Sequence, residues 1–356
     1  WTTRPPLRAP WSPARSSRPC RLAPRMDDVP KAELHVHLEG TAPPSLVRRL
    51  AERNGLRLPD GLFADEDEFA WTDFLDFLRT YDLAAGVIRT GEDYRDVTYE
   101  YLCACAREGC VYVELIASPG HADAVGLPDA EHFGGIAAGI DDARRDCGIE
   151  GRILAAAVRN HGVESAEALA RRLAEDRHPY VVGFQLAGDE AGYPPEPFAQ
   201  AYAIAAASGL GCSVHAGEHA GAESVRGALT LPVTRISHGV RAIEDPALVA
   251  ELAERRIVLE VCPTSNVATG VFPSYEDHPL GALRDAGVRV TLGSDDPPYF
   301  GCSIGSEYAV ARKRLGVDGG ELVDITRTAV EGAFADDGLK RALLARVDRA
   351  CDRRTD

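Results

Sequence analysis

The stretch that decides the fold is Glu33-Leu-His35-Val-His37-Leu-Glu39-Gly40. It overlaps residues 32–38, a run whose apolar residues predict a buried strand. Residues i and i+2 of a strand point to the same face, so the imidazoles of His35 and His37 can reach one metal ion. Taken alone, the same His-x-His pattern also fits a surface or packing role, so it needs support from the other strands.

Seven more short apolar runs follow, and helical patterns separate most of them. The predicted strands cover residues 32–38, 111–117, 152–158, 181–186, 212–215, 235–237, 258–261 and 289–292. Amphipathic helices are predicted over residues 166–174, 196–207, 222–229, 246–255 and 279–285. Eight strands with intervening helices predict an α/β fold, a (β/α)8 TIM barrel. The alternative, an open doubly wound sheet, would carry a glycine-rich phosphate loop after its first strand, and His-Leu-Glu-Gly-Thr is no such loop.

Two additions to the barrel are expected. About seventy residues separate the first two strands, which predicts a helical insertion. Within it, Trp71, Phe74, Leu75 and Leu78 have i, i+3, i+4, i+7 spacing. We interpret this segment as a packed helix, with an apolar lid over the barrel mouth (residues 62–82) as the alternative. After Asp296 the chain predicts a helical C-terminal extension.

Composition limits the function classes. The 356 residues include 45% hydrophobic and 26% charged residues, as expected for a globular enzyme, and no apolar run is long enough to span a membrane. A net charge of −16 disfavours nucleic acid as a partner and leaves a small-molecule substrate as the expectation. The sequence does not indicate an oligomeric state.

The N-terminal segment differs from the rest. Residues 1–25 contain six Arg, six Pro and no acidic residue, and the only methionine, Met26, follows them. We expect residues 1–25 to be a disordered leader outside the native protein, with an organelle transit peptide as the alternative. Residues 26–356 are then expected to form a single (β/α)8 barrel domain.

The cysteines indicate a reducing compartment. There are nine, an odd number, scattered along a long chain and without a Cys-x-x-Cys pair. We expect most of them to be small buried side chains and the protein to be cytoplasmic.

Polar residues also end later strands. The fifth is followed by His215 and Glu218, the sixth by His238, and the eighth by Asp295 and Asp296. Each motif alone has a structural alternative, such as a buried histidine or a capped turn. Because the carboxyl ends of all barrel strands meet at one rim, we expect these side chains to converge.

The set His35, His37, His215 and Asp295 would supply three nitrogen ligands and one oxygen ligand with a position left for water. That is the composition of a catalytic zinc site. Two-metal barrel hydrolases commonly bridge their ions with a carboxylated lysine on the fourth strand, but that strand ends without lysine. The chain contains only Lys31, Lys313 and Lys340. One Zn²⁺ per chain is therefore expected.

The motifs resemble those of the adenosine deaminases, with adenine deaminases and 6-aminodeoxyfutalosine deaminases as close relatives. The resemblance extends from about residue 30 to about residue 308. It rests on His35-Val-His37-Leu-Glu39-Gly40, Leu186-Ala-Gly188-Asp189-Glu190, His215-Ala-Gly-Glu218, Ser237-His238-Gly239, Val261-Cys-Pro-Thr-Ser-Asn266 and Ser294-Asp295-Asp296-Pro297.

The resemblance implies roles for the site residues. Zinc would generate hydroxide by lowering the pKa of water towards ~7. Glu218 is similar to the acid that protonates purine N1, and His238 to the residue that takes the water's proton and holds the oxygen over C6. Asp296 is similar to the residue that orients the hydroxide and accepts a hydrogen bond from purine N7, and the Gly188 N–H would meet N3.

Substrate preference depends on Glu39. Adenosine deaminases usually carry Asp there to bind the ribose 5′-hydroxyl, and His-Leu-Glu-Gly and Tyr299-Phe300-Gly301 are typical of the adenine-type relatives. Leu-Ala-Gly-Asp-Glu, in contrast, is the adenosine-type form. We expect deamination of adenosine or 2′-deoxyadenosine to the inosine product and ammonia. The alternatives are an adenine or 6-aminodeoxyfutalosine deaminase, a hydrolase of another amide or ester, and a non-catalytic purine-binding barrel.

Overall fold

The computed structural model describes residues 29–352, and their side chains through residue 350. The predicted leader over residues 1–25 lies outside the described residues.

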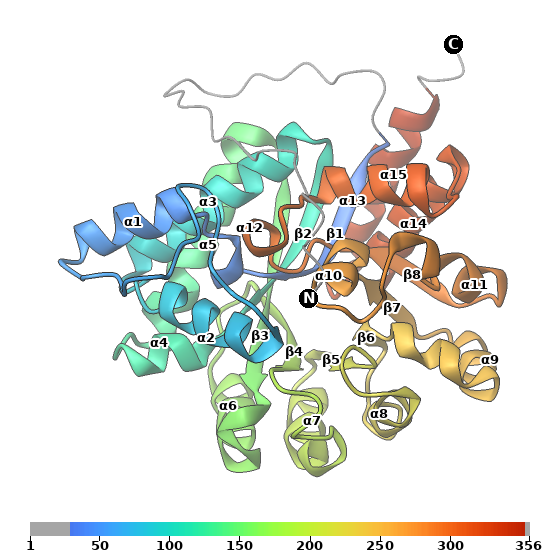
Figure 1. Cartoon of the computed structure of the whole chain (residues 1–356), viewed down its shortest axis with the longest axis horizontal. Helices are drawn as coiled ribbons and strands as arrows, with labels where there is room; N and C mark the ends of the chain where they lie inside the picture. Colours follow the sequence, from blue (N-terminus) through green and yellow to red (C-terminus); the bar gives the residue numbers. More distant parts are fainter. Residues whose placement is uncertain (1–28, 353–356) are drawn as a thin grey trace.

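Eight parallel strands form the predicted barrel, and each pairs with the next in chain order (Figure 1). They are β1 (Lys31–His37), β2 (Cys110–Ala117), β3 (Glu150–Val158), β4 (Val181–Ala187), β5 (Gly211–Ala216), β6 (Arg235–His238), β7 (Val258–Val261) and β8 (Arg289–Leu292). The ring closes where His37 N donates to the Asp295 carbonyl (3.0 Å) and Asp295 N donates to the His35 carbonyl (3.2 Å). The carboxyl ends of the strands therefore share one rim.

Helices surround the barrel (Figure 1). They are α1 (Pro44–Arg53), α2 (Phe74–Ala85), α3 (Gly91–Arg107), α4 (Pro119–Ala124), α5 (Asp129–Cys147), α6 (Val163–Glu175), α7 (Ala199–Ala207), α8 (Ala222–Ala228), α9 (Pro246–Glu254), α10 (Pro263–Ala268), α11 (Leu280–Asp285), α12 (Pro297–Phe300), α13 (Ile304–Arg314), α14 (Gly319–Gly332) and α15 (Asp337–Asp352). The 3-10 turns are η1 (Glu39–Thr41), η2 (Arg159–His161), η3 (Glu196–Phe198), η4 (Val240–Glu244) and η5 (Tyr275–Asp277). Helices α6, α7, α8, α9 and α11 occupy the predicted stretches, with ends that differ by a few residues.

The insertion between β1 and β2 is helical, as predicted, and contains α1, α2 and α3. Helix α2 begins at Phe74 because the Asp73 side chain accepts a hydrogen bond from Asp76 N and caps the first turn. Trp71 therefore precedes the helix, and Leu75 is 53% exposed. The expected apolar face is only partly formed.

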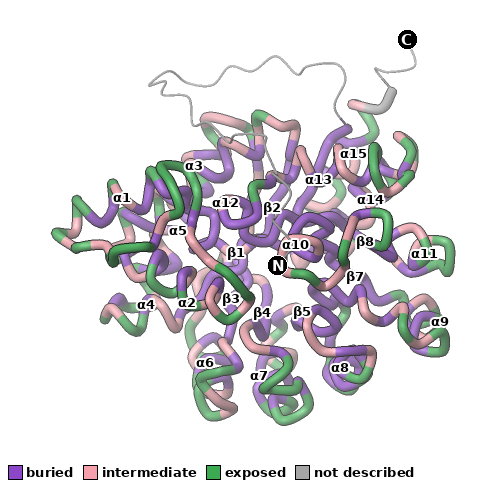
Figure 2. The backbone as a smooth tube through the Cα atoms, in the orientation of Figure 1, coloured by how far each residue is buried: buried purple, intermediate pink, exposed green. Residues whose placement is uncertain are grey.

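The helical C-terminal extension is also present. It comprises α13, α14 and α15, and α14 packs against β1 and β8. Figure 2 shows that buried residues follow the strands and the inner faces of the helices, whereas exposed residues lie on the outer faces. Among the described helices, none combines the length and apolar character that a membrane crossing requires.

A buried ion-pair network lies in the barrel interior. The Arg235 side chain is 1% exposed, and its Nη1 and Nε atoms each lie 2.6 Å from a carboxylate, those of Glu114 and Glu260 respectively. The Ser237 hydroxyl also donates to Glu260 (2.7 Å). Charges inside a barrel persist only when they are paired and hydrogen-bonded in this way. Glu260 belongs to β7, and its backbone carbonyl contacts the metal-ligand candidate His35.

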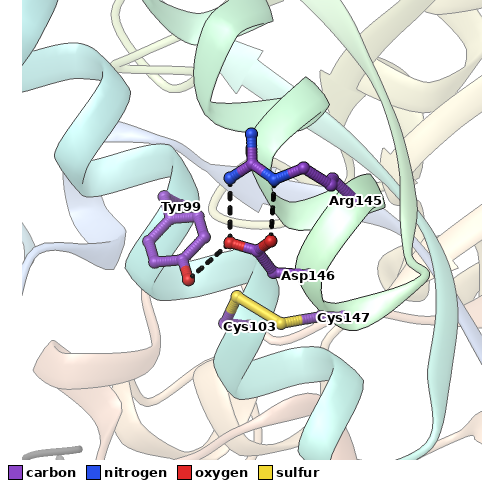
Figure 3. Close-up of a disulfide and its surroundings, with 5 residues drawn as sticks. All are labelled: Tyr99, Cys103, Arg145, Asp146 and Cys147. Atoms are coloured by element: carbon purple, nitrogen blue, oxygen red, sulfur yellow. Dashed lines mark hydrogen bonds and ion pairs between the residues drawn. A yellow bond between two sulfur atoms is a disulfide. The ribbon is translucent and has the colours of Figure 1, made fainter. Parts of the chain in front are cut away.

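The cysteine prediction needs one correction. Cys103 of α3 and Cys147 of α5 form a disulfide with Cα atoms 5.9 Å apart, beside the ion pair of Arg145 and Asp146 (Figure 3). The 44-residue separation gave no sign of this pairing, because it results from the close packing of α3 against α5. The free cysteines among the described residues are all buried, as expected: Cys105, Cys110, Cys212, Cys262 and Cys302. A cytoplasmic location stays a prediction.

Candidate active site

Strands β1 and β5 and the loop after β8 bring the four predicted metal ligands together. Asp295 Oδ1 lies 3.2 Å from His35 Nε2 and 3.3 Å from His37 Nε2. His37 Nε2 in turn lies 3.2 Å from His215 Nε2. Four side chains from remote parts of the chain thus direct their polar atoms at one point.

The tautomers of two of these histidines suit metal binding. His35 Nδ1 lies 3.1 Å from the Glu260 carbonyl, and His215 Nδ1 lies 3.2 Å from the Leu186 carbonyl. A carbonyl can only accept, so each Nδ1 carries a proton, and in the neutral form of each ring the Nε2 atom presents a lone pair. Nitrogen lone pairs and a carboxylate that converge inside a protein fit a cation, and three nitrogens with one oxygen fit Zn²⁺.

Electrostatics favour positive charge at this point: burial would lower the pKa of His35, but the charge and hydrogen bond of Asp295 raise it to about 9. Burial would raise the pKa of Asp295, but the charge of His35 and the hydrogen bonds of His35 and His37 hold it well below its usual range. Burial and the neighbouring charges of His35 and His37 lower the pKa of His215 well below its usual value. Anionic Asp295 and neutral His215 are the forms that coordinate a metal.

The proximity of groups defines two overlapping sets of potential ligand atoms. His35, His215, His238 and Asp295 form one set, and His37, Asp295 and Asp296 form the other; the atoms of each lie within 4.8 Å of one another. Asp295 belongs to both sets. Distance alone therefore does not separate ligand histidines from a neighbouring histidine.

Backbone strain marks the same rim. His238 and Asp295 have φ angles of 60° and 62°, in the left-handed region that non-glycine residues rarely adopt. The Ser265 hydroxyl donates to Asp295 Oδ2 (2.7 Å) and helps to hold that carboxylate. Strained residues of this kind concentrate at functional sites because the surrounding structure must hold them in place.

Glu218, the predicted acid, follows β5 and is 6% exposed. Its Oε2 lies 3.6 Å from His238 Nε2, and its Oε1 lies 3.3 Å from His219 Nε2. Burial would raise the pKa of Glu218, but the charges of His238 and His219 lower it. The carboxylate thus lies beside the metal-ligand cluster without joining it.

Glu190 is a site residue to which sequence reasoning gave no role. Its Oε1 accepts from Gly217 N (2.5 Å), and its Oε2 accepts from Glu218 N (3.0 Å), His219 N (2.9 Å) and Ala220 N (3.0 Å). One buried carboxylate therefore holds the whole backbone turn that carries the acid. Its position two residues after Gly188, at the end of β4, was the only sequence signal.

Asp296 and Gly188 lie where the sequence predicted them, at the pocket. Asp296 is 3% exposed, and among the described residues its Oδ1 has no hydrogen-bond partner. Burial and the charges of Asp295 and Glu218 raise its pKa well above the usual value. Gly188 follows β4 with φ 102°, and a Cβ there would approach Asn160 Oδ1 to 2.4 Å, so only glycine suits this turn.

A pocket of about 710 Å³, including its open mouth, contains these groups. Phe74, Phe77 and Leu78 of α2 line it, so the segment predicted as a packed helix also covers the barrel mouth, as in the lid alternative. The predicted site residues among its lining are His37, Gly188, His215, Glu218, His238, Asp295 and Asp296. His35 lies beneath them and is fully buried.

Glu39, the residue predicted to decide substrate preference, does not line the pocket either. It is 2% exposed, and its Oε1 accepts from Ser118 N at 3.0 Å. The hydroxyl of Tyr81 lies 3.3 Å from Oε2, and that of Tyr94 lies 3.5 Å from Oε1. Ser118 and Tyr81 line the pocket, so residues that cap the carboxylate face the cavity in its place.

Comparisons with known proteins agree with this geometry. The family model described as adenosine deaminase matches residues 30–350. A protein from Agrobacterium fabrum named adenine deaminase is 46% identical over 321 residues, covering 90% of this chain and 98% of that protein. One from Sinorhizobium medicae with the same name is 46% identical over 316 residues, covering 88% and 97%.

Solved structures show the same similarity. The crystal structure of adenine deaminase from Arthrobacter aurescens superposes with a TM-score of 0.84 at 33% identity, covering 91% of this chain and 99% of that chain. A zinc-bound amidohydrolase from Burkhoderia ambifaria superposes with a TM-score of 0.82 at 28% identity, covering 92% and 93%. The chain therefore belongs to the adenosine deaminase family, and it is a hydrolytic deaminase of that family.

Proposed function

We propose that this protein is a zinc-dependent adenine deaminase, which hydrolyses the exocyclic C6–N bond of adenine to give a 6-oxopurine and ammonia. The observation that carries the proposal is the convergence of Glu218, Asp296 and His238 over a three-histidine, one-aspartate cluster inside one pocket. The relatives at 46% identity, which are named adenine deaminase, support the same reaction.

The free base is a better substrate for this pocket than the nucleoside that the sequence analysis favoured. A nucleoside would need a partner for its ribose 5′-hydroxyl, and Glu39 was the expected one. Its carboxylate is already capped by Ser118 N and by the hydroxyls of Tyr81 and Tyr94. The names of the relatives and the capped carboxylate together support adenine, the alternative in the sequence analysis.

A nucleotide substrate is disfavoured on charge. Among the described residues that line the pocket there is no Arg or Lys. Four acidic residues line it: Asp82, Glu218, Asp295 and Asp296. A phosphate group would meet net negative charge and would lack the cationic partners that such groups need.

His35, His37, His215 and Asp295 would hold the metal. When bound, zinc supplies Lewis acidity that makes hydroxide available near neutral pH. The chain's own residues then bind and protonate the ring.

Three residues contact the ring in this proposal. Glu218 delivers a proton to N1, which makes C6 electrophilic. Asp296, whose Oδ1 is free of partners among the described residues, forms a hydrogen bond with N7. The Gly188 N–H faces N3. The apolar side chains of α2 cover the ring and exclude water from the pocket.

Ammonia release from a panel of substrates tests the proposal. Zinc-loaded protein should show its highest kcat/KM with adenine, above adenosine, 2′-deoxyadenosine and 6-aminodeoxyfutalosine, and metal analysis should give one zinc per chain. Glu218→Gln should keep the zinc and lose roughly 10²–10⁴-fold in rate. The exposed Glu175→Gln, a matched control on α6, should behave as wild type. Turnover of adenosine without adenine would contradict the free-base proposal, and zinc binding without any turnover would favour the non-catalytic purine-binding barrel.

A further inference from the structure

A chain of three buried hydrogen bonds lies behind His238, on the side away from Glu218. Leu280 N donates to His278 Nδ1 (3.2 Å), His278 Nε2 lies 3.2 Å from Asn266 Oδ1, and Asn266 Nδ2 lies 3.1 Å from His238 Nδ1. The exposed fractions are 7% for His278, 0% for Asn266 and 1% for His238. Water therefore has little access to this chain.

The direction of every proton in this chain follows from its first donor. A backbone N–H can only donate, so His278 Nδ1 must accept, and neutral His278 carries its proton on Nε2. That proton points at Asn266 Oδ1, which orients the amide so that Nδ2 donates to His238 Nδ1. Neutral His238 is then left with its proton on Nε2. Burial lowers the pKa of His278 to about 4, which keeps the first ring of the chain neutral at neutral pH.

This tautomer is opposite to that of the neighbouring histidines. His35 and His215 place Nδ1 against backbone carbonyls, so their Nε2 atoms present lone pairs. His238 places Nδ1 against an amide donor, so its Nε2 presents a proton. A nitrogen that bears a proton cannot coordinate a metal ion, although His238 lies as close to the cluster as His35 and His215 do.

We propose that Asn266 and His278 are positioning residues that hold His238 in the Nε2–H tautomer. Held in this way, His238 is excluded from the metal-ligand set and donates a hydrogen bond to the oxygen that attacks the substrate. This last step rests on the proposed deaminase function. It differs from the role that the family resemblance implied, in which His238 takes the proton from water. Glu218, whose Oε2 lies 3.6 Å from His238 Nε2, is then the group that takes that proton and passes it to N1.

Nuclear magnetic resonance of the imidazole nitrogens tests the tautomer without substrate. Full-length protein labelled with ¹⁵N-histidine is measured metal-free and zinc-loaded, and His238 is assigned by the signals missing from His238→Gln. We expect an unprotonated Nδ1 and a protonated Nε2 for His238 in both samples. We expect the opposite pattern for His215 in the metal-free sample. A protonated Nδ1 on wild-type His238 would overturn the proposal, whether or not the protein deaminates adenine.

Two variants separate positioning from a general structural role. Asn266→Asp replaces the donating amide with an accepting carboxylate, so the protonated and unprotonated signals of His238 should exchange. Thr264→Val is the control, because Thr264 lies on α10 with Asn266. The change removes a buried hydrogen bond between Thr264 and Tyr275 and leaves the hydrogen bonds of Asn266, His278 and His238 in place. It should leave the His238 signals unchanged. An Asn266→Asp protein that is folded and keeps the wild-type tautomer would also overturn the proposal.

Discussion

Replacement of Glu190 by Gln should loosen the turn that carries Glu218. The Glu190 carboxylate accepts four backbone hydrogen bonds, one at Oε1 from Gly217 N and three at Oε2. A glutamine can present its oxygen to only one side of this arrangement. Its amide group would then place N–H against N–H at the other side, because both groups are donors.

The magnitude follows from the bonds that are lost. A hydrogen bond to a charged acceptor contributes about 1.5–3 kcal/mol, and a buried donor left without a partner costs about 1–3 kcal/mol. Glu190→Gln should therefore lower the free energy of unfolding by about 2.5–6 kcal/mol. Displacement of the acid by as little as ~1 Å is enough to cost about 100-fold in rate, so kcat/KM should fall by about that factor. The zinc content should not change, because none of the proposed ligands contacts Glu190.

The assays are urea unfolding, metal analysis and ammonia release from adenine. Glu175→Gln makes the same chemical change at an exposed position of α6 and serves as the control. A Glu190→Gln protein with wild-type stability and wild-type kcat/KM would refute the reasoning that this carboxylate holds the turn. A protein that loses activity together with its zinc would show that Glu190 supports the metal cluster and not the acid alone.

Three further predictions concern the metal cluster, a buried acid and a helix contact. His215→Ala should lose both zinc and activity, since it removes one of the proposed ligands, and metal analysis that finds wild-type zinc would contradict this. Burial raises the pKa of Glu307 from 4.5 to about 7, so its neutral form is favoured in the fold and its contribution to stability is lost as pH rises through that window. In urea unfolding, the free energy of unfolding of Glu307→Gln should match that of wild type below about pH 4.5 and exceed it above about pH 7 by up to about 3 kcal/mol. Parallel pH profiles of the two proteins would contradict this. Gly135→Ala should destabilise by about 1–3 kcal/mol, because its Cβ would lie 2.2 Å from the Gly91 carbonyl oxygen. The neighbouring Gly134→Ala meets nothing within 4 Å and should stabilise by about 0.5–1 kcal/mol, so equal effects on the unfolding midpoint would refute the contact argument.

The barrel was predictable because its signals are local. Apolar runs and the polar residues that end them depend on spacing along one strand, and the parallel barrel rule places all strand ends at one rim. His35 and His37 needed only their i, i+2 spacing, and His215 and Asp295 needed only their positions after β5 and β8. The convergence of these four side chains in the structure follows the sequence argument closely.

The supporting contacts were not predictable in the same way. Glu190 follows β4 and accepts hydrogen bonds from the turn at residues 217–220, which follows β5. Asn266 of α10 contacts His238 at the end of β6 and His278 after η5. Cys103 reaches Cys147 only because α3 packs on α5. Each of these pairs has ordinary sequence spacing, so nothing local distinguishes it from residues that never meet.

The sequence by itself therefore determined the fold class and the candidate metal ligands, since each depends on residue type and on position along a strand, and its motifs indicated the general reaction through their resemblance to the adenosine deaminases. Only the tertiary structure decided which way the Glu39 carboxylate is capped, which donor orients His238 and which side chains cover the pocket. Those features depend on the distance and direction between atoms of remote segments, and packing sets both. The proposed preference for a purine base over its nucleoside draws on this second group, because it depends on which groups face the cavity.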